Sequence, residues 1–417
     1  MKTFDFEEMV DRRGSLSVKW NRDAITNICG NPEAEAFWVA DMDFPAPPAV
    51  LAAAHELSDH GVYGYPVAID QRTIFCTWAK NRHNLDLEPS QVVISQGVLT
   101  SLSTLIEVLT DEGDGVIVGL PAYQPFMRIV NNYRRTLLNW PMKYDEESRR
   151  FSLDWERLEE LLPNAKALIF CSPHNPTGMV FSADELISLC SLAAKHQVTI
   201  ISDEIHADLA FTPHHCLLDA AKVTGCRAVV LMAPSKTFNI AGEHYSVTLF
   251  GDRELQNLFI KRREQLSALS PSITAITLAR AAYQQGGPWL DSVIEMLKDR
   301  VDLVERHLFE HAPSLRFITP HASFIGLIDC KRILYFVEQD AALHPDIYDS
   351  ALSPQGGLLS RFFGQRASVA MNDGTWFGGE EYRRFVRLNY AAPTDKLTAA
   401  LDRMASAVQE ARKRYSN

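Results

Sequence analysis

Four residues that could take part in binding or chemistry lie at or just after the ends of short apolar runs, where buried strands would end. They are Gly97 after VVIS (92–95), Asn175 after ALIFCS (167–172), Asp203 at the end of VTIISD (198–203) and Lys236 after AVVLMA (228–233). In an open parallel sheet, ligands bind where the carboxyl ends of the strands meet, so we expect these residues to line one crevice. Together they would offer an amine nucleophile, a carboxylate, an amide and a helix N-terminus that binds anions.

Each of these residues has a plainer interpretation when it is taken alone. Lys236 by itself would be a solvated surface lysine, and Asn175 between two prolines would be a turn residue. Asp203 with His206 and Asp208 suggests a metal site, but there is no second histidine motif, so we expect no metal. The functional interpretation therefore depends on finding the residues as a set.

A pyridoxal phosphate (PLP) enzyme uses such a set, with a different task for each member. Lys236 would form a Schiff base with the cofactor's aldehyde, and Asp203 would pair with the pyridine nitrogen. Asn175 would hydrogen-bond the phenolic oxygen, and backbone N–H groups after Gly97 would bind the phosphate. Tyr123, in LPAYQPF, would stack on the ring. We therefore expect PLP as the cofactor.

Five motifs in order carry a family resemblance. They are DMDFPAPPAV (41–50), HGVYGYP (60–66), SPHNPTG (172–178), SDEIHADL (202–209) and SKTFNIAG (235–242). This series resembles the fold type I PLP enzymes of the aminotransferase class I/II superfamily, and within it the cystathionine β-lyase-like C–S lyase branch. The similarity covers about Val18 to Gly242 and returns in RLN (387–389). The resemblance implies an α/β fold with a mostly parallel seven-stranded sheet between helices and a smaller α+β domain.

The resemblance also assigns cofactor contacts to residues outside the initial set. It implies a backbone phosphate cradle at Gly97, Val98 and Leu99, with Ser235 as a weaker candidate for the same phosphate. His206 stands where aspartate aminotransferase-like relatives carry a tyrosine, so it is expected either to touch the phenolic oxygen or to support the site.

Three further assignments concern the substrate and a second subunit. Arg387 matches the arginine that binds the substrate's α-carboxylate, although a structural ion pair is the plainer alternative. Asp41 lies in a turn that is near the substrate in relatives, although helix capping is its plainer role. Tyr65 resembles a tyrosine that reaches the partner's phosphate across a homodimer interface, although core packing would also account for it.

The implied reaction is α,β-elimination, in which a cysteine-type amino acid such as cystathionine yields a thiol, pyruvate and ammonia. An aminotransferase shares the first half of that reaction and is the nearest alternative. A regulatory binding protein on the same fold is a further alternative. Departures from the family pattern include His244 and Ala233 near the phosphate, Ser323-Phe324, and a long stretch from Asp329 to Gly374 that is expected to reshape the substrate entrance.

The elements that must position these residues follow from hydrophobic periodicity. Besides the runs named above, GVIVG (115–119) and SVTLFG (246–251) have the continuous apolar character of buried parallel strands. Ser182 and Glu185 predict a capped helix between two strands, and 289–311 predicts a long amphipathic helix. We expect a large PLP-binding domain over 46–290 and a small domain formed by 1–45 with 291–417.

Composition narrows the class of protein further. The chain has 417 residues, a size at which two domains are usual, and its net charge of −11 argues against a nucleic-acid surface. No apolar run is long enough to span a membrane and no signal-peptide core is visible, so we expect a cytoplasmic protein. Seven scattered cysteines suggest reduced packing residues, and the pair His214-His215 is expected at the surface.

Overall fold

The computed structural model describes residues 4–67, 69–268 and 270–416. Its centre is a seven-stranded sheet with the order β2-β10-β9-β8-β7-β3-β4. The strands are β2 (Val92–Ser95), β3 (Gly115–Leu120), β4 (Thr136–Pro141), β7 (Ala165–Cys171), β8 (Thr199–Asp203), β9 (Ala228–Met232) and β10 (Ser246–Phe250). All neighbours pair in parallel except β10, which is antiparallel to both β2 and β9. The predicted mostly parallel sheet is confirmed.

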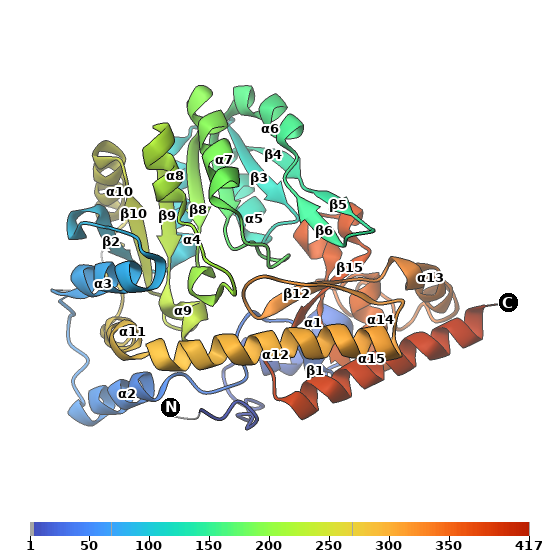
Figure 1. Ribbon diagram of the computed structural model, residues 1–417. Coiled ribbons are helices and arrows are strands. Elements are labelled where there is room, and N and C mark those ends of the chain that lie inside the picture. Colours follow the sequence, from blue (N-terminus) through green and yellow to red (C-terminus); the bar gives the residue numbers. More distant parts are fainter. Residues whose placement is uncertain (1–3, 68, 269, 417) are drawn as a thin grey trace.

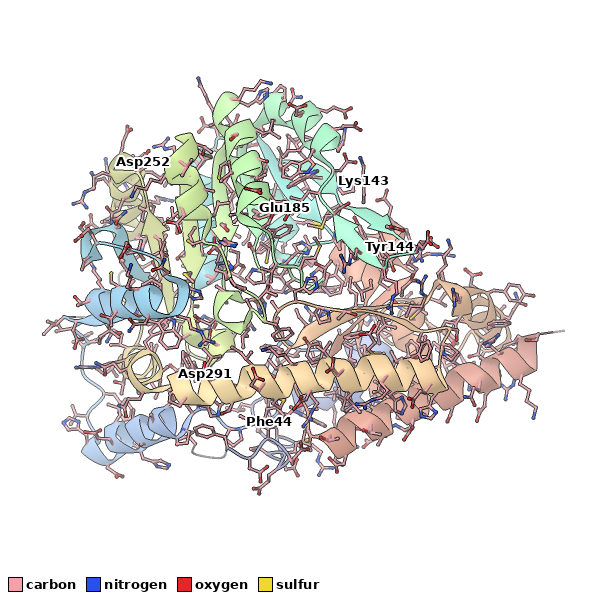
Figure 2. All side chains as sticks on the ribbon, in the orientation of Figure 1. Phe44, Lys143, Tyr144, Glu185, Asp252 and Asp291 are labelled. Carbon is pink, nitrogen blue, oxygen red and sulfur yellow. The ribbon has the colours of Figure 1, made fainter. Side chains whose placement is uncertain are left out.

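Helices cover this sheet and explain why its strands are apolar on both faces (Figure 1). Those that follow or precede its strands are α4 (Val98–Leu109), α5 (Pro125–Asn132), α6 (Trp155–Leu161), α7 (Ala183–Lys195), α8 (Leu217–Thr224), α9 (Pro234–Thr237) and α10 (Arg253–Gln265). The predicted capping box is present at α7, where Ser182 N–H donates to Glu185 Oε2 over 2.8 Å (Figure 2 labels Glu185). The reciprocal bond runs from the Glu185 N–H to Ser182 Oγ over 3.3 Å.

A second, antiparallel sheet lies beside the first, with the order β11-β12-β15-β14. Its strands are β11 (Arg316–Ile318), β12 (Ile325–Asp329), β14 (Asn372–Asp373) and β15 (Phe385–Asn389), and the helices of the same region are α13 (Leu334–Leu343), α14 (Leu358–Ala367) and α15 (Thr394–Tyr415). The N-terminal α1 (Arg22–Cys29) and β1 (Glu35–Ala36) belong with this part, because β1 pairs in parallel with β13 (Val369–Ala370). This pairing agrees with a small domain built from both ends of the chain, whereas the boundaries at 46 and 290 remain a prediction.

Contacts at several places join the two parts. The long helix α12 (Gly287–His311) runs from the large part towards α15 (Figure 1). A hairpin of β5 (Lys143–Asp145) and β6 (Arg150–Ser152) leans on the second sheet, where the Tyr144 ring packs edge-on against Phe385 at 5.2 Å (Figure 2 labels Tyr144). The loop around Phe44 is bound to the large part by Asn239, whose side-chain N–H groups donate to Met42 O and Phe44 O.

The remaining helices are α2 (Pro48–His60), α3 (Gln71–His83) and α11 (Ile273–Gln285). No helix in the described ranges is long and apolar enough to cross a membrane. The expectation that His214 lies at the surface is wrong. Its side chain is buried, and its Nε2 lies 2.7 Å from Glu204 Oε2. Its pairing with a buried carboxylate explains why a polar ring is held inside.

Candidate active site

A cavity of about 540 Å³ lies at the carboxyl ends of the central strands, where the two sheets approach each other. Its walls include every predicted site residue except Tyr65 and Asp41. These are Gly97, Val98, Leu99, Tyr123, Asn175, Asp203, His206, Ser235, Lys236 and Arg387. Residues far apart in the sequence therefore meet in one space, as expected for an open α/β sheet.

Lys236 lies on α9, a single helical turn that directly follows β9. Pro234 occupies the first turn, where its missing N–H costs nothing and its fixed φ favours the helix. The Lys236 Nζ donates a hydrogen bond to Ala40 O over 2.6 Å. Burial lowers the pKa of Lys236 to about 8, because desolvation disfavours the charged amine. A substantial fraction of the amine is therefore neutral, and nucleophilic, near physiological pH.

Asp203 ends β8 and is 5% exposed. Burial raises the pKa of its carboxyl to about 7, while a hydrogen bond from the Ile205 N–H over 3.1 Å and the positive charge of Lys236 oppose that rise. Within the described part of the chain, no lysine, arginine or histidine side chain forms an ion pair with the Asp203 carboxylate. The site thus holds a buried acid suited to a positively charged ligand atom.

Arg387 on β15 crosses from the second sheet into the cavity and is 3% exposed. Its Nη1 donates to Asn175 Oδ1 over 3.0 Å, and its Nη2 donates to Asn372 Oδ1 over 2.7 Å and to Trp38 O over 2.8 Å. Among the described residues its Nε–H has no partner, and no carboxylate pairs with the guanidinium. Burial lowers the pKa of Arg387 to about 10. The plainer alternative for Arg387, a structural ion pair, is therefore absent among the described residues, and the guanidinium charge is available to an anionic ligand.

The start of α4 forms the anion-binding end of the cavity. Gly97 caps this helix with φ +94°, a backbone conformation that favours glycine. The first-turn N–H groups, including those of Val98 and Leu99, have no partner within the helix and carry its positive dipole charge. His244 stands beside this turn, with Nδ1 3.5 Å from where a Cβ on residue 97 would lie. The histidine that departs from the family pattern thus faces the same end of the cavity.

His206 is buried next to the cavity, and its Nδ1 lies 2.9 Å from Ser323 Oγ. Burial lowers the pKa of the ring to about 3, and the positive charges of Lys236 and Arg387 act in the same direction. His206 is therefore a neutral imidazole whose orientation is set by Ser323. The serine that departs from the family pattern at 323 thus has a defined partner in this chain.

The two remaining predicted residues lie outside the cavity wall. The Asp41 carboxylate pairs with Arg12 at 2.6 Å and with Lys19 at 3.4 Å, so a direct contact of Asp41 with substrate stays a prediction. Tyr65 is fully exposed, in a segment without helix or strand. Its predicted role requires a second subunit and is not tested by a single chain.

Several cavity residues were not predicted from the sequence. Asn372 orients Arg387, Trp376 stands with its ring centroid 5.8 Å from that of Tyr123, and Gln355 completes the wall. Behind Lys236, the Thr237 hydroxyl donates to Asp208 Oδ2 over 2.8 Å. The one signal available for Asp208 was its place in the motif SDEIHADL, two residues after His206.

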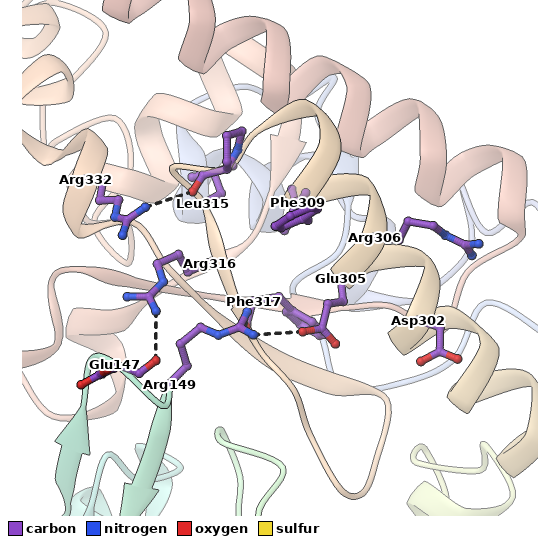
Figure 3. Close-up of a pocket in the computed structure, with 12 residues that line it drawn as sticks. Glu147, Arg149, Asp302, Glu305, Arg306, Phe309, Leu315, Arg316, Phe317 and Arg332 are labelled. Carbon is purple, nitrogen blue, oxygen red and sulfur yellow. Dashed lines mark hydrogen bonds and ion pairs between the residues drawn. The ribbon is translucent and has the colours of Figure 1, made fainter.

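A larger hollow of about 810 Å³ lies elsewhere, between the β5–β6 turn and the end of α12 (Figure 3). Its charged side chains largely neutralise one another, as in the Arg149–Glu305 ion pair at 3.1 Å. It shares no residue with the walls of the cavity around Lys236. Size alone therefore does not identify the active site here, and the chemistry lies in the smaller cavity.

The comparisons with known proteins agree with this geometry. The family model for aminotransferase class I and II matches residues 37–404, and the chain belongs to this family. It is 36% identical over 335 residues to cystathionine beta-lyase PatB of Bacillus subtilis (strain 168), a match that covers 78% of this chain and 84% of PatB. It is 30% identical to protein MalY of Escherichia coli (strain K12), over 98% of this chain and 100% of MalY.

A solved structure gives the same result for the fold. The crystal structure of cystalysin from Treponema denticola, which contains a pyridoxal 5'-phosphate cofactor, matches with a TM-score of 0.86 and 26% sequence identity. The match covers 98% of this chain and 99% of cystalysin. The predicted fold class and the predicted family are confirmed.

Proposed function

We propose that this chain is a PLP-dependent carbon–sulfur β-lyase that cleaves cysteine-type amino acids such as cystathionine to a thiol, pyruvate and ammonia. The observation that carries the proposal is one cavity that holds a lysine with a lowered pKa, a buried acid and a buried arginine without a carboxylate partner in the described protein, namely Lys236, Asp203 and Arg387. The relatives named cystathionine beta-lyase support the choice of sulfur substrates.

The residues of the cavity fit PLP at each of its polar groups. Lys236 would hold the aldehyde carbon, and Asp203, which lacks a cationic partner in the described protein, would face the ring nitrogen. Asn175 would face the phenolic oxygen, Tyr123 would cover the ring, and the free N–H groups after Gly97 would take the phosphate. When bound, PLP withdraws electrons from the Cα of an attached amino acid and so acidifies its proton.

The chain's own residues supply binding and proton transfer. The Arg387 guanidinium, with its unpaired Nε–H, binds the substrate's α-carboxylate and fixes the orientation of Cα. With a pKa of about 8, the Lys236 Nζ is basic enough to accept the Cα proton and acidic enough to be neutral beforehand. Neutral His206 adds no competing positive charge, and Tyr123 with Trp376 shields the reacting atoms from water. Loss of the thiolate from Cβ, followed by addition of water, gives thiol, pyruvate and ammonia.

Turnover of L-cystathionine separates this proposal from transamination. We expect pyruvate at the same rate with and without an added 2-oxo acid, because elimination needs no amino acceptor. A strict requirement for the 2-oxo acid would identify an aminotransferase, and no turnover of either kind by PLP-loaded protein would contradict both enzymes. Lys236→Ala should abolish pyruvate formation, whereas Lys222→Ala, an exposed lysine on α8, serves as the matched control.

We infer that the enzyme works as a cytoplasmic homodimer. The segment around Tyr65 exposes an unusual group of large apolar side chains, Val62, Tyr63, Tyr65, Val67 and Ile69. A second copy of the chain would cover these side chains and bring Tyr65 to the phosphate of the PLP bound in the other subunit. All seven cysteines have free thiols, which supports a reducing compartment. Sedimentation at micromolar concentration should give twice the chain mass, and a monomer mass would contradict the inference.

A further inference from the structure

A second space adjoins the active-site cavity, and its wall includes Gln124, the residue after Tyr123. This space, which we call the distal hollow, has a volume of about 580 Å³ and shares Gln355 and Trp376 with the wall of the cavity. Its other walls come from the start of α5 and from residues 375–379. Because Gln355 and Trp376 line both spaces, the two spaces are neighbours.

The long stretch between Asp329 and Gly374 builds part of the distal hollow. Pro354, Gln355 and Gly356 belong to this stretch, and all three line the hollow. The segment is held in place, since the Gln355 N–H donates to Asn27 O over 3.0 Å and Arg361 Nη2 donates to Gly356 O over 2.8 Å. The expectation that this stretch shapes the entrance of the site agrees with the position of Gln355.

Arg128 is the charged residue in the wall of the distal hollow. Its side chain is exposed, and among the residues that the structure describes it forms no ion pair with a carboxylate. Burial raises the pKa of the Tyr123 hydroxyl, and the positive charges of Arg387 and Arg128 oppose that rise. Both guanidinium groups are therefore within electrostatic reach of the same hydroxyl.

We propose that the distal hollow receives the thiol side of the substrate and that Arg128 selects thioethers whose leaving thiol carries an anionic group, such as a carboxylate. This inference rests on the proposed lyase function. With the α-carboxylate bound to Arg387, a substrate's sulfur would leave the cavity past Tyr123 and Trp376, two aromatic rings that suit a thioether. A second carboxylate would then meet Arg128, because the described walls of the hollow offer no other cationic side chain.

Two cysteine conjugates of equal shape test the selection. S-(2-carboxyethyl)-L-cysteine and its amide, S-(2-carbamoylethyl)-L-cysteine, differ in charge at one end, and thiol release by the PLP-loaded enzyme gives kcat/KM for each. We expect the carboxylate-to-amide ratio of kcat/KM to fall about fivefold in Arg128→Gln, the size of effect typical of a partly exposed charge pair. Comparing ratios between variants cancels the difference between the two leaving thiols.

Two control variants separate a local effect of Arg128 from the general effect of removing one positive charge from the protein surface. Arg306→Gln removes an exposed arginine from the other hollow (Figure 3) and should leave the carboxylate-to-amide ratio of kcat/KM unchanged. Arg128→Lys keeps the positive charge and should keep most of the wild-type preference for the carboxylate. An unchanged ratio in Arg128→Gln, or an equal fall in Arg306→Gln, would overturn the proposal. The oxygen analogues of both probes are tested for binding by calorimetry, so a binding preference without any thiol release would refute the lyase but not the distal hollow.

Discussion

Replacing Asp203 with asparagine should stabilise the protein without its cofactor while impairing the enzyme. The carboxyl of Asp203 is 5% exposed and has no cationic ion-pair partner in the described protein, so its negative charge is costly to bury. Its pKa is raised by burial from the ordinary value of 3.8 to about 7. An asparagine side chain at this position would keep the shape and a hydrogen-bonding oxygen but remove the charge.

The size and sign of the effect follow from proton linkage. Between pH 4 and pH 7 the folded state keeps a proton that the unfolded chain releases, so the stability of the wild-type protein falls as pH rises through this window. Since one pH unit corresponds to about 1.36 kcal/mol, the cost reaches about 4 kcal/mol above pH 7. Between pH 5 and pH 7, the advantage of Asp203→Asn over wild type should therefore grow by about 2 kcal/mol, because the folded carboxyl is already half ionised at pH 7.

Urea unfolding of both PLP-free proteins at pH 5, 6 and 7 measures this difference. Circular dichroism and tryptophan fluorescence must give coincident transitions, because a chain of 417 residues does not always unfold in one step. PLP should reverse the order, stabilising wild type more than the variant, because the ionised carboxylate would pair with the protonated ring nitrogen. If the difference in free energy of unfolding between wild type and Asp203→Asn is the same at all three pH values, a raised pKa of Asp203 is not its cause.

Three further predictions concern other parts of the site. Arg387→Gln should lower kcat/KM for L-cystathionine by roughly ten- to a hundredfold, as expected for losing a charge-assisted hydrogen bond, and unchanged steady-state kinetics would exclude Arg387 from substrate binding. Gly97→Ala, at φ +94°, should lower the free energy of unfolding by about 1–2 kcal/mol, and a urea midpoint equal to wild type would contradict this. Thr237→Val, which removes a buried hydrogen-bond donor from Asp208, should cost about 1–3 kcal/mol of stability and reduce kcat, whereas Thr237→Ser should restore both values in the same assays.

The central sheet could be predicted from local sequence because its strands are buried on both faces. The six apolar runs correspond to β2, β3, β7, β8, β9 and β10 within one or two residues at each end. The seventh strand, β4, was expected from the family but not located, since it is an edge strand with exposed positions such as Thr136 and ends at Pro141. The exposed positions of β4 interrupt the apolar signal, whereas β2, at the opposite edge, keeps it because all four of its residues are buried.

The meeting of Lys236, Asp203 and Asn175 in one cavity was also predictable, because each lies at or just after the end of a strand of one sheet. What could not be predicted depends on contacts between distant segments. Arg387 is oriented by Asn372, and the Asp41 carboxylate is paired with Arg12 and Lys19. The buried ring of His214 has its Nε2 2.7 Å from Oε2 of Glu204, ten residues earlier, a contact that hydrophobic periodicity does not record.

Borohydride reduction of the PLP-loaded protein, followed by proteolysis and mass spectrometry, identifies the lysine that carries PLP. Reduction makes the bond between lysine and cofactor permanent. We expect a single phosphopyridoxyl-modified peptide, containing Lys236 and the residues of SKTFNIAG. Modification of a different lysine, or an unmodified Lys236 peptide from protein that still cleaves L-cystathionine, would contradict this expectation.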